Sequence, residues 1–175
     1  MDMFERKTED ELSRVAPLAA RMRPHEFNDF IGQEKIIGQH SVLRRSLDKR
    51  NVPSLILWGP PGSGKTTLAN LISSSTKMHL EKLSAVTSGV ADIKSSIKQA
   101  QTRLGMNQQR TIVFIDEIHR LNKSQQDVVL PYVENGTIIL IGATTENPSF
   151  EVIAPLLSRC QVFKLEQLDS DHIKT

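Results

Sequence analysis

The sequence contains one cysteine, one tryptophan and one tyrosine, and its net charge is only +2. A single cysteine, Cys160, excludes an intramolecular disulfide and a cysteine-cluster metal site, and it agrees with a reducing interior. No uninterrupted apolar run approaches the roughly 20 residues that a helix needs to cross a bilayer, so we expect no membrane partner. The small net charge does not by itself indicate binding to nucleic acid.

The first thirty residues also lack the pattern of a targeting signal. Acidic residues, including Asp2, Glu5 and Glu9, stand there among arginines. This mixture suits neither the apolar core of a signal peptide nor an acid-poor transit sequence. Nothing in the segment therefore marks the chain for export.

The chain is long enough and apolar enough to form one hydrophobic core. It is 175 residues long, with 38% hydrophobic and 24% charged residues, which is ordinary for a single globular domain. We expect residues 1–23 to form a linker, residues 24–168 the core, and residues 169–175 the start of a helix that the chain is too short to complete. A helical stripe is predicted for residues 33–49, interrupted at Gly38.

Short apolar runs alternate with helical stretches beyond residue 51. The runs read as buried parallel strands at residues 55–58, 79–83, 112–115, 138–141 and 162–165. The predicted crossover helices are residues 65–75, 91–104 and 124–134. This alternation predicts an α/β fold.

The strongest motif is a phosphate-binding loop. It consists of Gly59, Pro60, Pro61, Gly62, Ser63, Gly64, Lys65 and Thr66, which fit G-x-x-x-x-G-K-[ST] between a predicted strand and a predicted helix. The glycines allow backbone N–H groups to point inward at phosphate oxygens, and the following helix aims its positive end at the same place. Lys65 supplies a charge for the β and γ phosphates, and the Thr66 hydroxyl is a ligand for magnesium.

Two acids follow the strand predicted at residues 112–115. Asp116 is the natural partner for Mg²⁺, and Glu117 can polarise a water toward the γ phosphate. The next strand ends in Gly142, Ala143, Thr144 and Thr145. A hydroxyl there could contact the attacking water or the γ phosphate, but an ordinary transition from strand to turn is an equal interpretation.

Together these motifs resemble the ATPase core of the AAA+ superfamily. The matching strings, in chain order, are residues 59–66, 114–117, 142–145 and 157–160, preceded by residues 22–24 and 30–33. More narrowly, residues 118–127 and 143–150 are similar to the replication-associated recombination protein A family, which includes the Werner-helicase-interacting ATPases. The resemblance implies a P-loop NTPase three-layer sandwich with a five-stranded parallel sheet, here without the family's helical lid.

The resemblance also implies roles for individual residues. Thr145 aligns with the first sensor position, where many relatives have Asn. Arg159 corresponds to an arginine finger that reaches the nucleotide of a neighbouring subunit, although from the residues alone a surface salt bridge is the better interpretation. Binding of ATP or ADP with Mg²⁺ is expected at the loop and its flanks, including Ile31, Gly32 and Thr67, with the base near residues 22–32.

The family's biology supplies the expected partners. Its members act on DNA at stalled forks and strand junctions, assemble into rings of a tetramer or hexamer type, and work beside replication proteins such as single-strand binding protein. The expected location is the nucleoid in a bacterium or the nucleus in a eukaryote.

We expect weak hydrolysis by this chain alone, and the alternative is a nucleotide-gated subunit like those of clamp loaders or the Holliday-junction motor. A small-molecule kinase is disfavoured, because the segments after the strands carry Asp-Glu and Thr-Thr instead of an acceptor pocket.

Overall fold

The fold is known from a computed structural model that describes residues 22–49 and 51–168. Its centre is a parallel five-stranded sheet in the order β2-β3-β4-β1-β5. The strands are β1 (Ser54–Trp58), β2 (His79–Ser84), β3 (Thr111–Asp116), β4 (Ile138–Thr144) and β5 (Cys160–Lys164). All five predicted strands are present, so the predicted fold class is confirmed.

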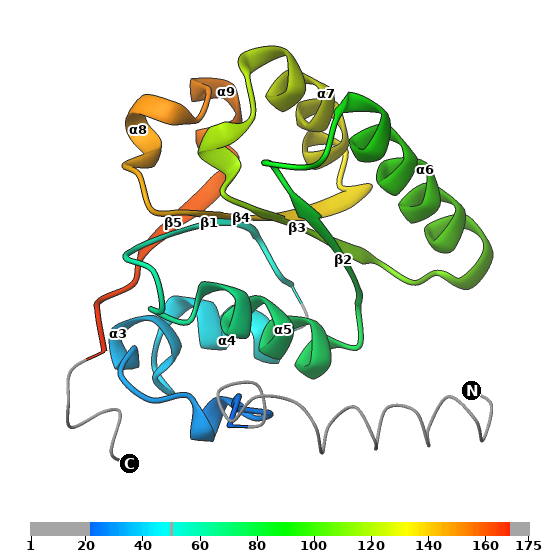
Figure 1. The fold of residues 1–175 in the computed structure, drawn as a ribbon. Coiled ribbons are helices and arrows are strands. Elements are labelled where there is room, and N and C mark those ends of the chain that lie inside the picture. Colours follow the sequence, from blue (N-terminus) through cyan, green and yellow to red (C-terminus); the bar gives the residue numbers. More distant parts are fainter. Residues whose placement is uncertain (1–21, 50, 169–175) are drawn as a thin grey trace.

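Helices cover both faces of the sheet and complete a three-layer sandwich (Figure 1). One face carries α3 (Glu34–Ile37), α4 (Val42–Asp48) and α5 (Lys65–Thr76), with the short helix η1 (Phe27–Asp29) nearby. The other face carries α6 (Val90–Asn107), η2 (Ile118–Arg120), α7 (Lys123–Glu134), α8 (Pro148–Glu151) and α9 (Ala154–Leu157). The predicted interruption of the first helical stripe is confirmed, because α3 ends before Gly38 and α4 begins at Val42.

Successive side chains of the central strands point to opposite faces of the sheet and pack into two separate hydrophobic cores. In β3, Ile112 and Phe114 join the core under α3, α4 and α5, whereas Val113 and Ile115 join the core under α6 and α7. Every residue of β4 is buried. Burial on both faces explains why these strands read as continuous apolar runs in the sequence.

Strand β4 is longer than its sequence predicts. The expected end was residue 141, but the strand continues to Thr144. Gly142 stays in the sheet because its missing side chain leaves room for neighbours: a Cβ there would lie 2.8 Å from the Cδ1 atoms of Ile118 and Ile56. The small residues are therefore part of the packed strand, and they carry its polar end further toward the loop side of the sheet.

Two predicted segments, residues 1–21 of the linker and residues 169–175 of the lid start, lie outside the described residues. Within the described ranges, no helix is both long and apolar enough to cross a membrane.

Candidate functional site

The phosphate-loop motif lies where a central strand ends and a helix begins. Strand β1 ends at Trp58, and α5 begins at Lys65 with Gly64 as its N-cap. Because β1 lies between β4 and β5, the loop leaves the middle region of the sheet at its carboxyl edge. This is the edge at which open parallel sheets bind ligands.

The loop turns through backbone conformations that suit glycine. Gly62 has φ +77° and Gly64 has φ +94°. A Cβ on Gly64 would also lie 2.8 Å from Phe30 Cζ, whereas a Cβ on Gly62 would meet no atom within 4 Å. Phe30 is a buried member of the core under α5, so it cannot move away cheaply. The segment before α3 thus fixes the loop by direct contact.

We expect Gly64→Ala to destabilise the protein more than Gly62→Ala does. Both changes place a Cβ on a left-handed backbone, which costs about 1–2 kcal/mol. Only Gly64→Ala adds the clash with Phe30, for which a further loss of roughly 1–3 kcal/mol is expected. Urea unfolding of the two variants measures the difference, and equal stabilities would contradict the role of the Phe30 contact.

Lys65 is held by the loop that it follows. Its Nζ donates to the backbone oxygens of Gly59 and Pro60, each at 2.8 Å, and the residue is only 8% exposed. Burial lowers the pKa of the Lys65 ammonium below its ordinary value, while the carboxylates of Glu117 and Asp116 act in the opposite direction. The result is a cation in the loop with two carboxylates near it.

The two carboxylates lie at the end of the strand that pairs with β4. Asp116 is the last residue of β3, and its Oδ1 accepts a hydrogen bond from the Glu117 amide at 3.1 Å. Glu117 has φ +53°, an uncommon backbone conformation for a residue other than glycine. Such outliers persist where the surrounding structure holds them, and they cluster at functional sites.

One cavity of about 1020 Å³ joins these parts. It is bounded by the segment before α3, the loop, the start of α5 and the ends of β3 and β4. The predicted site residues that line it are Ile31, Pro61, Gly62, Ser63, Gly64, Lys65, Thr66, Thr67, Asp116, Glu117 and Thr145. Residues far apart in the chain therefore meet in one space large enough for a nucleotide.

Four of the predicted residues lie outside the lining of this cavity. Gly59 and Pro60 contribute instead the carbonyl oxygens that hold Lys65. Gly32 turns its amide to Glu34 Oε1, at 3.3 Å. Arg159 lies after α9 and does not reach the cavity of its own chain.

The residues present fit a magnesium nucleotide. Among the described residues no group of three or more His, Cys, Asp or Glu could hold a metal by itself. This agrees with Mg²⁺, which is usually held by one or two protein oxygens together with waters and substrate phosphates. The Thr66 and Asp116 side chains, which both line the cavity, supply such oxygens. Within the loop, Ser63 Oγ is buried and has no hydrogen-bond partner among the protein atoms.

The two threonines at the end of β4 have different environments. Thr144 is fully buried, and its Oγ1 accepts from the Glu146 amide at 3.0 Å. Thr145 is the one that lines the cavity. Its position fits a contact with substrate, whereas Thr144 holds the turn that follows the strand.

Arg159 makes an ion pair within its own chain. Its Nη2 contacts Glu134 Oε1, and its Nη1 donates to Pro155 O at 2.7 Å and to Ser158 Oγ at 2.9 Å. The side chains of Arg159 and Glu134 are 41% and 40% exposed. Exposed pairs of this kind contribute about 0–1 kcal/mol, so a stronger partner can displace Glu134.

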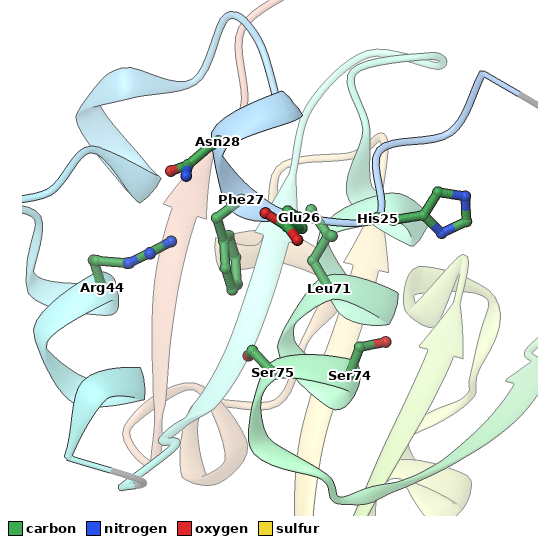
Figure 2. A pocket seen from close by; sticks show the side chains of 8 residues that line it. All are labelled: His25, Glu26, Phe27, Asn28, Arg44, Leu71, Ser74 and Ser75. Atoms are coloured by element: carbon green, nitrogen blue, oxygen red, sulfur yellow. The ribbon is translucent and has the colours of Figure 1, made fainter.

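A smaller hollow of about 300 Å³ shares part of its lining with the main cavity, and Figure 2 shows the side chains that line this hollow. His25 and Asn28 line both spaces, so the segment around η1 is the wall between them. Figure 2 shows Phe27 of this segment next to Arg44, whose guanidinium carbon lies 4.7 Å from the ring centroid. Such stacking stabilises by about 0.5–1 kcal/mol at an exposed site and here fixes the wall against α4.

Two contacts of the site were absent from the sequence-based prediction. The packing of Phe30 on Gly64 joins residues 34 positions apart, and the motif G-x-x-x-x-G-K-T says nothing about what lies beneath it. The second contact is between His119 Nδ1 and Glu117 Oε2, which lie 3.3 Å apart. The string Asp-Glu-Ile-His-Arg contained a signal for that contact, because a short helix after Glu117 returns His119 toward the strand end.

Comparison with known proteins identifies similar P-loop ATPases and recombination proteins. The model of the Holliday junction DNA helicase RuvB P-loop domain matches residues 22–162. The ATPase WRNIP1 of Dictyostelium discoideum is 53% identical over 160 residues, which cover 91% of this chain and 18% of that protein. Replication-associated recombination protein A of Escherichia coli K12 is 49% identical over 158 residues, which cover 90% of this chain and 35% of that protein. The chain thus spans about a third or less of these relatives.

A similar solved structure has the same P-loop fold. The Thermotoga maritima RuvB Holliday junction branch migration motor superposes with a TM-score of 0.71 at 30% identity, over 87% of this chain and 51% of that one. The predicted relation to replication-associated recombination protein A and WRNIP1 is confirmed by the two sequence relatives. With the family model matching most of its length, the chain belongs to the family of the Holliday junction DNA helicase RuvB P-loop domain.

Proposed function

We propose that this chain is the ATP-binding and ATP-hydrolysing motor domain of an AAA+ ATPase that acts in replication-fork maintenance, recombination and DNA repair. The observation that carries the proposal is the single cavity in which Lys65, Thr66, Asp116 and Glu117 meet. In this proposal residues 24–168 form the ATPase core. The names of two similar proteins, an ATPase and a recombination protein, support the biological role.

The cavity suits ATP or ADP along its whole length. The loop residues 62–64 and the start of α5 offer backbone N–H groups to the phosphates. The base has room beside the segment of residues 22–31, which lines the other end. Lys65 exchanges its carbonyl partners for phosphate oxygens, a change that a charged ligand favours because charge-assisted hydrogen bonds are stronger.

The chemistry is divided among three side chains at the phosphate end. Thr66 and Asp116 hold Mg²⁺, which neutralises charge on the phosphates when bound. Glu117 accepts a proton from the water that attacks the γ phosphate. Thr145, at the tip of β4 and in the same cavity, contacts the γ phosphate or the water.

Arg159 acts on the nucleotide of a neighbouring subunit in a ring. Its position outside the cavity of its own chain and its exposed, weak pair with Glu134 support this role. Charges supplied in this way are worth about 10³–10⁵ in rate in phosphoryl transfer generally. The ring, of a tetramer or hexamer type, belongs to the proposal and is supported by the similarity to the RuvB branch migration motor.

We expect Arg159→Ala to lower ATP turnover of the assembled protein by at least 100-fold while leaving ATP affinity unchanged. Glu134→Gln is the matched control, because it breaks the same ion pair and leaves the guanidinium free. Steady-state hydrolysis and nucleotide titration separate the two variants. Equal turnover of Arg159→Ala, Glu134→Gln and the unmodified protein would assign Arg159 to a surface salt bridge alone.

The partners follow from the same proposal. The DNA substrates are forks and junctions between single and double strands, and single-strand binding protein is the replication protein expected beside them. The location is the nucleoid in a bacterium or the nucleus in a eukaryote. These expected partners and this location are supported by the name of two relatives, replication-associated recombination protein A.

Hydrolysis with and without forked DNA tests the proposal. A DNA-stimulated ATPase should show faster turnover when forked DNA is present, with little change in nucleotide affinity. The second candidate is a nucleotide-gated subunit of the clamp-loader or Holliday-junction-motor kind, which the family match favours. That candidate predicts nucleotide-dependent binding of partners with turnover that is slow in both conditions.

A further inference from the structure

The carboxylate of Glu117 has two oxygens in different surroundings. The side chain is 35% exposed and lines the cavity, yet its Oε2 is buried without a hydrogen bond. A buried carboxylate oxygen without a donor is costly, so such an atom needs an explanation in the structure. The polar atom beside it is Nδ1 of His119, at 3.3 Å.

His119 is itself held in place by the neighbouring strand. Its side chain is 11% exposed, and its Nδ1 lies 2.9 Å from Thr144 Oγ1 at the end of β4. Thr144 Oγ1 can direct its own proton to Glu146 O, at 3.3 Å, which leaves a lone pair for a donor on His119. A proton on Nδ1 is therefore donated to the Thr144 hydroxyl, and Glu117 Oε2 lies beside it at 3.3 Å as a second acceptor that makes no hydrogen bond.

We propose that His119 is a positioning residue for Glu117: the polar Nδ1–H group, 3.3 Å from Oε2, attracts that oxygen electrostatically and so keeps Oε1 directed into the cavity. The inference deepens the proposed ATPase function and rests on it. Because Oε2 is buried, Oε1 is the oxygen that can reach an attacking water. His119 does not line the cavity, so it acts through Glu117 and does not touch the substrate.

The arrangement also links two strand ends. Thr144, the last residue of β4, precedes Thr145, which lines the cavity, and His119 contacts Thr144 on one side and Glu117 on the other. A shift of β4 in response to the γ phosphate thus reaches the proton acceptor through one imidazole ring. When Glu117 turns away, Nδ1–H keeps Thr144 as its partner, so the ring is not left with a buried unpaired donor.

Three substitutions at position 119 in the intact protein test the inference. His119→Ala removes the donor. His119→Asn places an amide nitrogen at the same number of bonds from the backbone as Nδ1, whereas His119→Gln places it one bond further away. We expect kcat to fall about 10- to 100-fold in His119→Ala and His119→Gln and to stay within about threefold in His119→Asn. The affinity for ADP with Mg²⁺, measured by titration calorimetry, should stay within twofold in all three.

A second histidine provides a matched control. His79, at the start of β2, also lies beside a carboxylate, with its Nε2 3.2 Å from Glu81 Oε2. Arg103 contacts the same Glu81 oxygen at 3.1 Å, so His79→Ala leaves that carboxylate paired. We expect this variant to keep the kcat of the unmodified protein, which shows that loss of a histidine–carboxylate contact alone does not slow turnover.

The outcomes separate this inference from the function on which it rests. In a Glu117→Gln background, His119→Ala should cause no further loss of kcat, because the two residues act as one unit. An active unmodified protein whose kcat is unchanged in His119→Ala, or equally reduced in His119→Asn and His119→Gln, overturns the inference and leaves the ATPase proposal intact. A fall in ADP affinity or melting temperature parallel to kcat also overturns it, in favour of a structural role. An unmodified protein with no turnover overturns the proposed function and this inference together.

Discussion

Lys65→Ala is expected to reduce the affinity for ATP and ADP by at least about 100-fold. The ammonium is buried at the base of the cavity, with its Nζ bonded only to the loop's own carbonyl oxygens among the described residues. A bound nucleotide offers phosphate oxygens to this cation, and hydrogen bonds to charged groups contribute about 1.5–3 kcal/mol each. Two such bonds correspond to a loss of roughly 100-fold or more in affinity. Titration calorimetry with ADP and Mg²⁺ measures it directly.

The control for this experiment must separate lost binding from a collapsed loop. Lys94, an exposed lysine of α6, is suitable because Lys94→Ala removes the same charge far from the cavity lining. We expect Lys94→Ala to bind nucleotide as the unmodified protein does. Both variants should unfold cooperatively in urea. Unchanged affinity for ADP in a folded Lys65→Ala variant would show that the loop does not bind the nucleotide.

The local parts of the site were predictable because each depends on a short stretch of sequence. The loop glycines, Lys65 and the start of α5 fall within eight consecutive residues, and the structure places them as the motif requires. The position of Asp116 at a strand end follows from an apolar run that stops at an acid. Parallel strands then bring both to the same edge without further information.

The rest depends on contacts between distant segments, which no single stretch of sequence encodes. Phe30 packs against Gly64 only because α3 and α4 lie on the same face of the sheet as α5. The Arg159 pair with Glu134 requires α9 to lie beside α7. The end of β4 was misplaced for a similar reason, since the space around Gly142 is filled by side chains of η2 and β1.

Glu117→Gln is expected to leave nucleotide binding intact and to reduce turnover by about 10²–10⁴-fold. The amide has the shape of the carboxylate but cannot accept a proton from water, and general base catalysis contributes a factor of this size. The expected loss corresponds to about 3–5 kcal/mol of activation free energy. Glu117 lines the cavity, but its Oε2 makes no hydrogen bond to the loop, so the affinity for ADP should change little.

The neighbouring acid gives the decisive comparison. Asp116 lines the cavity one residue earlier and is assigned to Mg²⁺, so Asp116→Asn should raise the Mg²⁺ concentration needed for half-maximal turnover. Glu117→Gln should leave that concentration unchanged, because Glu117 serves the water and not the metal. Turnover measured over a series of Mg²⁺ concentrations distinguishes the two roles. If Glu117→Gln lost ADP binding together with turnover, or shifted the Mg²⁺ requirement as Asp116→Asn does, Glu117 would belong to the metal site or to the support of the fold.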